Sequence, residues 1–235
     1  MNMPGKKDYI FNGFSPKTLK FLRDLGANNN KVWFEAHNED YQRYLLEPLR
    51  NLVVELGEFM LSIDPHLEVT PAANRTISRI YRDTRFSKDK SLYRSNMWIT
   101  FKRPIEDWMD APAYFFEITP DSYRYGMGFY QASKKTMDRF REMIDDKPDE
   151  FLRLISPFSK QQLFEVAGAM YKRILDKSKT EEILNWYQRK SLYLVCNREI
   201  DDRLFGGGLV EDLLFGFGLV APFYHYLWKV CSTKG

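Results

Sequence analysis

The spacing of apolar residues changes abruptly at Pro65, and this change constrains the fold more than any other feature of the chain. Before it, apolar residues recur every three or four positions, as in Leu49, Leu52 and Leu56, which is typical of amphipathic helices. After it, short aromatic and β-branched runs alternate with turn residues as far as Tyr130, which is typical of strands. Helices that precede a set of strands predict an α+β fold instead of repeated βαβ units.

Capping residues mark several helices. Ser15 and Pro16 predict the start of a helix that ends at Gly26, because serine caps helices and proline suits the first helical position. Further helices are predicted over about 31–46 and 48–63, and Ser133 is predicted to cap another over 133–144. In the second half of the chain, helices are also predicted over 149–155, 160–174 and 180–189, before an apolar tail that reads as a buried C-terminal segment.

The predicted strands cover residues 67–70, 76–81, 97–102, 114–119 and 123–130, with 192–196 as a further candidate. Pro120 and Asp121 between the last two of the five indicate a hairpin. These segments predict a mostly antiparallel sheet of about five strands, covered by helices from both chain ends. We expect a single domain over 1–235, helical over 14–64, sheet over 65–131 and helical again over 132–235.

Composition excludes several classes of protein. The aromatic content of 16% is incompatible with a disordered chain, and a net charge of +3 disfavours a nucleic-acid-binding domain. No apolar run is long enough to cross a membrane and no signal peptide is present, so we expect a cytoplasmic protein with no membrane partner. The two cysteines and three histidines are scattered, so neither a metal nor a cofactor is predicted.

Positive charge is concentrated between residues 79 and 96. Six basic and two acidic side chains give this segment +4, so the rest of the chain sums to −1. The basic residues are Arg79, Arg82, Arg85, Lys88, Lys90 and Arg94, and the acidic ones are Asp83 and Asp89. Guanidinium groups match the oxygens of carboxylates and phosphates in pairs, and a short loop that carries several of them is suited to anion binding.

We therefore predict a binding site for a small anionic ligand bearing a phosphate or a carboxylate. Its predicted residues are Arg79, Arg82, Asp83, Arg85, Ser87, Lys88, Asp89 and Lys90. If the site is catalytic, Asp83 or Asp89 is the acid–base group. One alternative is single-stranded nucleic acid, which the interleaved aromatic residues could stack. Another is a structural ion-pair motif in a protein whose partner contacts lie in the apolar tail.

Three other patterns carry less weight. Ser87 and Lys90 have the spacing of a serine–lysine nucleophile pair, but that pair needs a helical turn and this segment reads as a loop. The asparagines Asn29 and Asn30 could complete an anion pocket, although a capping turn explains them as well. Gly126-x-Gly128 lies inside a predicted strand, where glycines mark a bulge or a close backbone approach.

Three motifs resemble a known family. They are Asn29-Asn30-x-x-Trp33-Phe34-Glu35-Ala36, Arg82-Asp83-x-Arg85-Phe86-Ser87-Lys88-Asp89-Lys90-Ser91-x-Tyr93 and Tyr125-Gly126-Met127-Gly128-Phe129-Tyr130. Together they resemble a widespread, mainly bacterial family of conserved hypothetical proteins, classed as a domain of unknown function, over about residues 14–194. The resemblance implies no reaction, substrate or cofactor, but it marks the second motif, which contains seven of the eight predicted site residues. The oligomeric state stays open.

Overall fold

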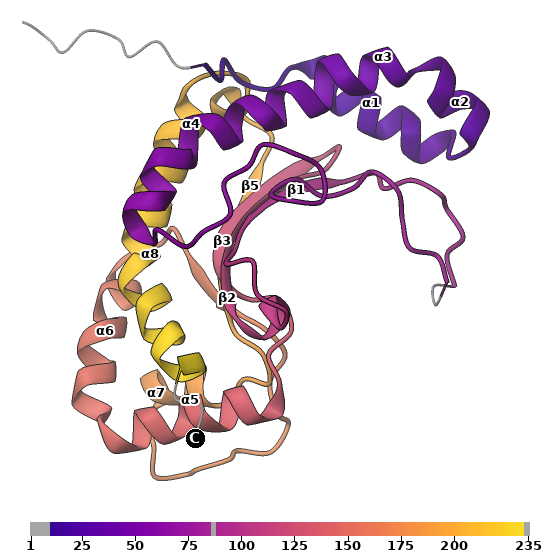
Figure 1. Ribbon diagram of the computed structural model, residues 1–235. Coiled ribbons are helices and arrows are strands. Elements are labelled where there is room, and N and C mark those ends of the chain that lie inside the picture. Colours follow the sequence, from indigo (N-terminus) through magenta and orange to yellow (C-terminus); the bar gives the residue numbers. More distant parts are fainter. Residues whose placement is uncertain (1–9, 86–87, 233–235) are drawn as a thin grey trace, which may run out of the picture.

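The computed structural model describes residues 10–85 and 88–232, and their fold is α+β, as predicted. Five strands form one antiparallel sheet in the order β1-β2-β3-β5-β4. They are β1 (Met97–Phe101), β2 (Pro112–Ile118), β3 (Ser122–Phe129), β4 (Glu165–Ala167) and β5 (Tyr193–Glu199). The sheet is curved, and its convex face is covered by the long C-terminal helix α8 (Gly208–Ser232) (Figure 1).

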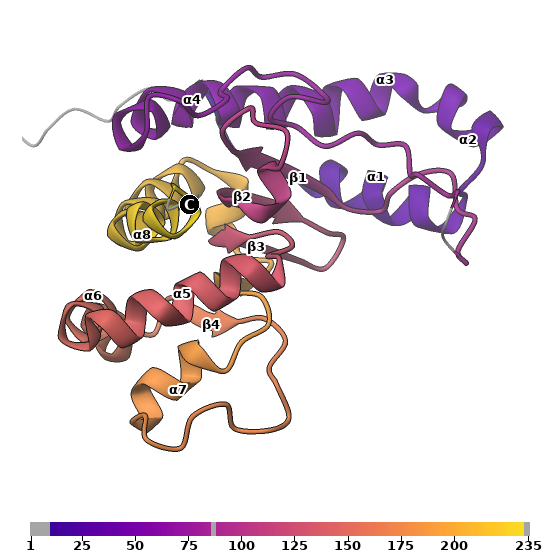
Figure 2. The ribbon, with the colours of Figure 1, turned by 60° about the horizontal axis from the view of Figure 1, so that its bottom comes forward.

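Helices from the two ends of the chain lie beside opposite edges of the sheet (Figure 2). The helices near β1 are α1 (Pro16–Ala27), α2 (Lys31–Ala36), α3 (Asn38–Tyr41), the π-helical turn η1 (Gln42–Leu46) and α4 (Glu47–Ile63). Those near β4 are α5 (Lys134–Asp146), α6 (Pro148–Lys160) and α7 (Glu181–Tyr187). Short 3₁₀ turns, η2 (Trp108–Asp110) and η3 (Asp202–Phe205), precede β2 and α8.

The capping signals behave as expected. Ser15 caps α1 by accepting from the Thr18 amide, and Ser133 caps α5 by accepting from the Thr136 amide at 3.1 Å. Proline at position 48 has no N–H for the carbonyl of Tyr44, four residues earlier. The buried hydroxyl of Thr18 donates to that carbonyl at 2.6 Å, which joins α1 to the π-helical turn and satisfies the freed acceptor.

Alternation along the strands separates a covered face from an open one. In β2, Tyr114, Phe116 and Ile118 are fully buried, and the ring of Tyr114 meets Phe217 of α8 at 5.1 Å. Helix α8 approaches β3 closely because residue 216 is glycine: a Cβ there would lie 2.7 Å from the Tyr125 ring. The predicted apolar tail is therefore a helix in the protein core.

Two expected strands are not strands of the sheet. Residues 67–70 form none, and 76–81 make only isolated bridges, including Ile77 to Ile99 of β1 and Tyr81 to Tyr93. The amide of Ser78 donates to Trp98 and that of Thr100 donates to Thr76, so the segment is extended and follows β1 for a few residues only. Asn74, with φ of 69°, turns the chain sharply just before it, which prevents a longer ladder.

The helix predicted over 160–174 is also wrong. Strand β4 occupies 165–167 and pairs with β5, so a tertiary contact overrides the local helical spacing. Gly168 follows with φ of +117°, and a Cβ there would lie 1.9 Å from the Ser191 carbonyl oxygen. Two smaller differences occur at α1, which continues through Gly26, and at α6, which is longer than the predicted 149–155.

The helices of residues 10–85 and 88–232 include none that is both long enough and apolar enough to cross a membrane.

Candidate ligand-binding site

The basic segment forms two extended arms and a projecting loop. The amide of Arg82 donates to the Leu92 carbonyl at 2.9 Å, and that of Arg94 donates to Ile80 at 2.8 Å. The arms are tied to the N-terminal helices, because the side chain of Asn29 both donates to and accepts from the backbone of Tyr93. Beyond these bonds, residues 83–85 and 88–91 project past the sheet (Figure 1).

Asn29 and Asn30 therefore have structural roles. Asn29 fixes the second arm, and Asn30 caps α2 by accepting from the Trp33 amide at 3.0 Å. Trp33 stacks on His37 with ring centroids 4.0 Å apart and packs against the core. Capping and packing account for this motif.

Charges in the loop largely pair with each other. Arg82 bonds to Asp89, and Arg85 reaches both oxygens of Asp83, the shorter contact being 2.7 Å. Lys90 donates to the Thr84 carbonyl at 2.9 Å. Arg79, Arg85, Lys88 and Lys90 are exposed, and Ser87 lies outside the described residues. The described part of the loop is consequently an ion-paired projection, and none of its side chains in 82–85 and 88–91 lines the hollow described next.

The two loop carboxyls are poor candidates for proton transfer. Hydrogen bonds from Arg85 lower the pKa of Asp83 to about 2. Hydrogen bonds from Ser91, followed by Arg82, lower the pKa of Asp89 to about 2. Both carboxylates stay ionised at neutral pH, whereas an efficient general acid or base needs a pKa near the working pH.

A hollow of about 420 Å³ lies over the open face of the sheet. Arg94 and Asn96 of the 79–96 segment line this hollow. Neither of them is among the eight predicted site residues. Its lining comes from β1, β2, β3, the η2 turn and the start of β5: Arg94, Asn96, Trp98, Thr100, Trp108, Ala113, Phe115, Glu117, Arg124, Gly128, Phe129, Tyr130 and Tyr193.

The strand register builds a polar row on the floor of this hollow. Trp98 of β1, Glu117 of β2 and Arg124 of β3 are direct cross-strand neighbours, so their side chains share the open face. Glu117 accepts from Arg124 Nε at 2.5 Å and from the Asn96 amide nitrogen at 2.5 Å. This carboxylate is only 12% exposed, and two donors hold it in one orientation.

Of the two arginines that line the hollow, Arg124 is paired with Glu117, whereas Arg94 has no carboxylate partner among the described residues. Its guanidinium lies 4.7 Å from the Trp98 ring centroid, and its buried Nε has no hydrogen-bond partner. Among residues 10–85 and 88–232 it forms no ion pair. Burial lowers the pKa of Arg94, and the nearby charges of Arg82 and Arg79 lower it further. A partly desolvated cation among other cations is unfavourable until an anion joins it.

Aromatic side chains form the other end of the hollow. The rings of Trp108 and Tyr130 lie 5.7 Å apart, and Tyr130 is 69% exposed. Lys102 sits 3.4 Å over the Trp108 ring, and burial lowers its pKa. Each of the two indoles is thus covered by a cation, and both cations are partly desolvated.

The glycines of β3 serve the sheet itself. A Cβ on Gly126 would lie 1.9 Å from the Leu194 carbonyl oxygen, and one on Gly128 would lie 2.4 Å from the Tyr193 Cα. The backbone that approaches them closely is β5, and this approach brings Tyr193 to the rim of the hollow.

In the described part of the chain, no group of three or more His, Cys, Asp or Glu side chains is placed to hold a metal ion. Cys196 and Cys231 are both in the reduced thiol form, and Cys196 is buried.

The sequence carries a partial signal for this hollow. Arg94 was counted in the charge of the segment, yet it falls outside the motif. Alternation within 97–101, 112–118 and 122–129 marks Trp98, Glu117 and Arg124 as one face of a sheet. Trp108 and Tyr130 carry no such pattern, because they lie in a turn and beyond a strand end.

The chain belongs to the family described as conserved hypothetical protein (DUF2461), whose profile matches residues 17–226. This match confirms the family resemblance and extends it well past residue 194 into α8. No curated protein matches the chain.

Proposed function

We propose that this protein binds a small anionic ligand, bearing a phosphate or a carboxylate, in the hollow over the open face of its sheet. Arg94 is the principal contact for the anion in this proposal. A hollow of about 420 Å³ is within the size range of small-molecule sites.

The observation that carries the proposal is the state of the Arg94 guanidinium. It borders the hollow, stacks on Trp98, keeps an unbonded buried Nε and has no ion-pair partner in the described part of the chain. Buried polar groups of folded proteins are nearly always hydrogen-bonded, so an unbonded donor at a hollow supports a role in ligand binding. An oxyanion would supply both the missing acceptor and the missing charge.

The loop contributes to the proposed site through its electric field. Arg79 and Arg82 already depress the pKa of Arg94, so their charges reach the hollow and attract anions. Asp83, Arg85, Lys88, Asp89 and Lys90 belong to the outer loop, from which a ligand would be steered inward.

The aromatic end favours a ligand with a flat or apolar portion. Trp98, Trp108 and Tyr130 offer ring surface, and aromatic stacking adds affinity without hydrogen bonds. Glu117 is held by two donors and is suited to orienting Arg124 on the floor.

The test is a thermal-shift screen of phosphorylated and carboxylated metabolites, with and without aromatic groups. A ligand at 100 times its Kd stabilises the native state by about 2.7 kcal/mol, which gives a clear rise in melting temperature. Arg94→Met keeps the aliphatic packing and removes the charge, so we expect about 10- to 100-fold weaker binding.

Arg85→Met is the matched control, because Arg85 lies in the loop outside the hollow. Equal loss of binding in the two variants would move the site to the loop, and retained binding in Arg94→Met would end the proposal. An oligothymidine arm separates the nucleic-acid alternative, which predicts that affinity falls steeply between 50 and 200 mM salt, in the manner of counterion release.

A further inference from the structure

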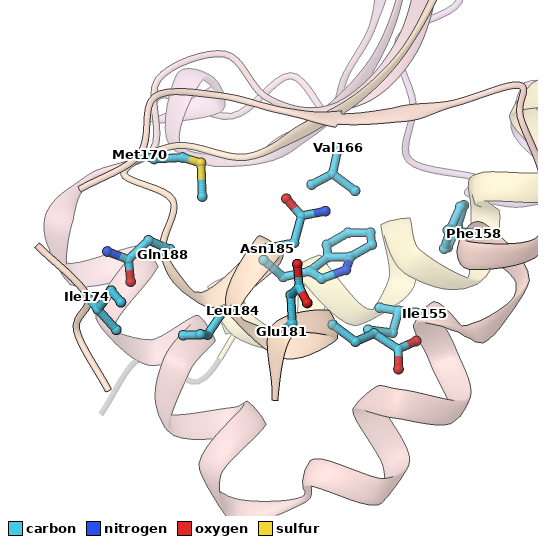
Figure 3. A pocket seen from close by; sticks show the side chains of 11 residues that line it. Ile155, Phe158, Val166, Met170, Ile174, Glu181, Leu184, Asn185 and Gln188 are labelled. Atoms are coloured by element: carbon cyan, nitrogen blue, oxygen red, sulfur yellow. The ribbon is translucent and has the colours of Figure 1, made fainter. Parts of the chain in front are cut away.

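A second hollow, of about 770 Å³, lies between α6, β4 and α7 and shares no lining residue with the proposed anion site. Figure 3 shows Ile155 and Phe158 of α6 on one side of it, Met170 and Ile174 on the other, and Asn185 of α7 between them. Most of its surface is apolar. Its volume matches small-molecule sites, which are mostly apolar concavities with a few polar groups.

The wall of this hollow is held by buried polar side chains. Gln188 donates to the Tyr171 carbonyl at 3.1 Å and accepts from the Leu175 amide at 3.0 Å. Arg189 donates to the Gly168 carbonyl at 2.8 Å and to the Asn185 carbonyl at 2.9 Å. These bonds tie the connection from β4 to α7 to the C-terminal end of α7.

Apolar side chains are exposed at the mouth. Met170 is 45% exposed and Ile174 is 49% exposed, whereas Phe158 and Trp186, which also line the hollow, are buried. Covering such surface with an apolar group is favourable by about 25 cal/mol per Å² removed from water. The hollow is therefore suited to the apolar body of a ligand.

Charge selects the head group of that ligand. The ionisable side chains in the lining are Glu181 and Glu182, and neither makes an ion pair with any residue of 10–85 or 88–232. The nearby Lys179 is engaged by Asp145 at 2.5 Å and does not neutralise them. Asn185 adds an amide beside them, and Figure 3 shows Glu181 and Asn185 next to each other.

We infer that this hollow is a second binding site, for a small amphiphilic ammonium compound. Its apolar body lies against Phe158, Val166 and Met170, and its ammonium group lies beside Glu181 and Asn185, with Glu182 adding a second negative charge at the start of α7. Carboxylates that face an apolar cavity discriminate against anions, which would approach them without a counter-charge. The site is thus opposite in charge preference to the hollow over the sheet.

Calorimetric titration with three compounds of one apolar body tests the inference: 4-phenylbutylamine, 4-phenylbutanol and 4-phenylbutyrate. The amine is expected to bind most tightly and the carboxylate most weakly. Glu181→Gln with Glu182→Gln should weaken amine binding about three- to tenfold and leave the alcohol unchanged, as expected of exposed ion pairs. Glu106→Gln, in an exposed loop, is the matched control.

Val166→Trp fills the hollow and should abolish binding of all three compounds. Met170→Trp does the same from the mouth and serves if the first variant does not fold. Melting curves of every variant check this, since the two glutamates also lie in the first turn of α7. Equal affinity for the amine and the carboxylate, or binding that survives a folded filling variant, would overturn the inference.

Discussion

Asp64 provides a sharp test of how the helices are joined. It is 2% exposed at the end of α4 and accepts from Arg103 Nε at 2.7 Å and from the Tyr224 hydroxyl of α8 at 2.5 Å. The His66 amide is a third donor, at 3.0 Å. Burial by itself would raise the pKa of this carboxyl, but the three donors outweigh it and lower the pKa from 3.8 to about 2.

The change we propose is Asp64→Asn, which keeps the shape and removes the charge. A fall in pKa from 3.8 to about 2, at 1.36 kcal/mol per pH unit, corresponds to about 2 kcal/mol of stability at pH 7. The charge of Arg103 is also left without its partner, so the expected loss is about 2 to 3 kcal/mol. Because the folded-state pKa is depressed, this stability is present above pH 3.8 and lost as pH falls towards 2.

Urea denaturation at pH 7, 5, 4 and 3 measures the effect. The difference in unfolding free energy between wild type and variant should be nearly constant from pH 7 to 5 and should fall by about half at pH 3. Asp121→Asn is the control, since that side chain is 82% exposed and its replacement should cost little stability at pH 7. A loss below about 0.5 kcal/mol at pH 7, or one that is the same at pH 3, would refute the reasoning.

Two further pairs of substitutions test the packing. Gly216→Ala should destabilise the protein by about 1 to 3 kcal/mol, because its Cβ would lie 2.7 Å from the Tyr125 ring. The Cβ of Gly218→Ala would meet no atom closer than 3.5 Å, so this control should stabilise α8 by up to about 1 kcal/mol. Arg141→Met removes buried bonds of 2.9 and 2.6 Å to two carbonyls and should cost about 2 to 4 kcal/mol, against little change for the exposed Arg153→Met. Chemical denaturation measures all four, and a similar response within either pair would contradict the packing argument.

Local chemistry was enough to predict much of the fold. Ser15 and Pro16 start α1, Ser133 starts α5, and the short turn at Pro120 joins β2 to β3, because each of these signals acts within a few residues. The helical segments at both ends and the antiparallel sheet follow from the spacing of apolar residues alone.

The errors lie where distant parts of the chain decide the structure. Strand β4 forms because β5, about 30 residues later in the sequence, offers an edge for pairing, and nothing local to residues 165–167 records that edge. The hollow over the sheet also depends on distant parts of the chain. Charge density identifies the projecting loop, whereas the register of three strands brings Trp98, Glu117 and Arg124 together on the floor of the hollow that Arg94 borders.

The position of α8 has a consequence for synthesis of the protein on the ribosome. The sheet strands emerge first, yet their convex face is covered by residues 208–232, which are translated after every strand. Until then, the aromatic rings of β2 and β3 are exposed to solvent, and they are liable to associate with other nascent chains. Arrest of translation before α8 should leave a chain that a chaperone must shield, and release of the final helix should be the event that permits its departure.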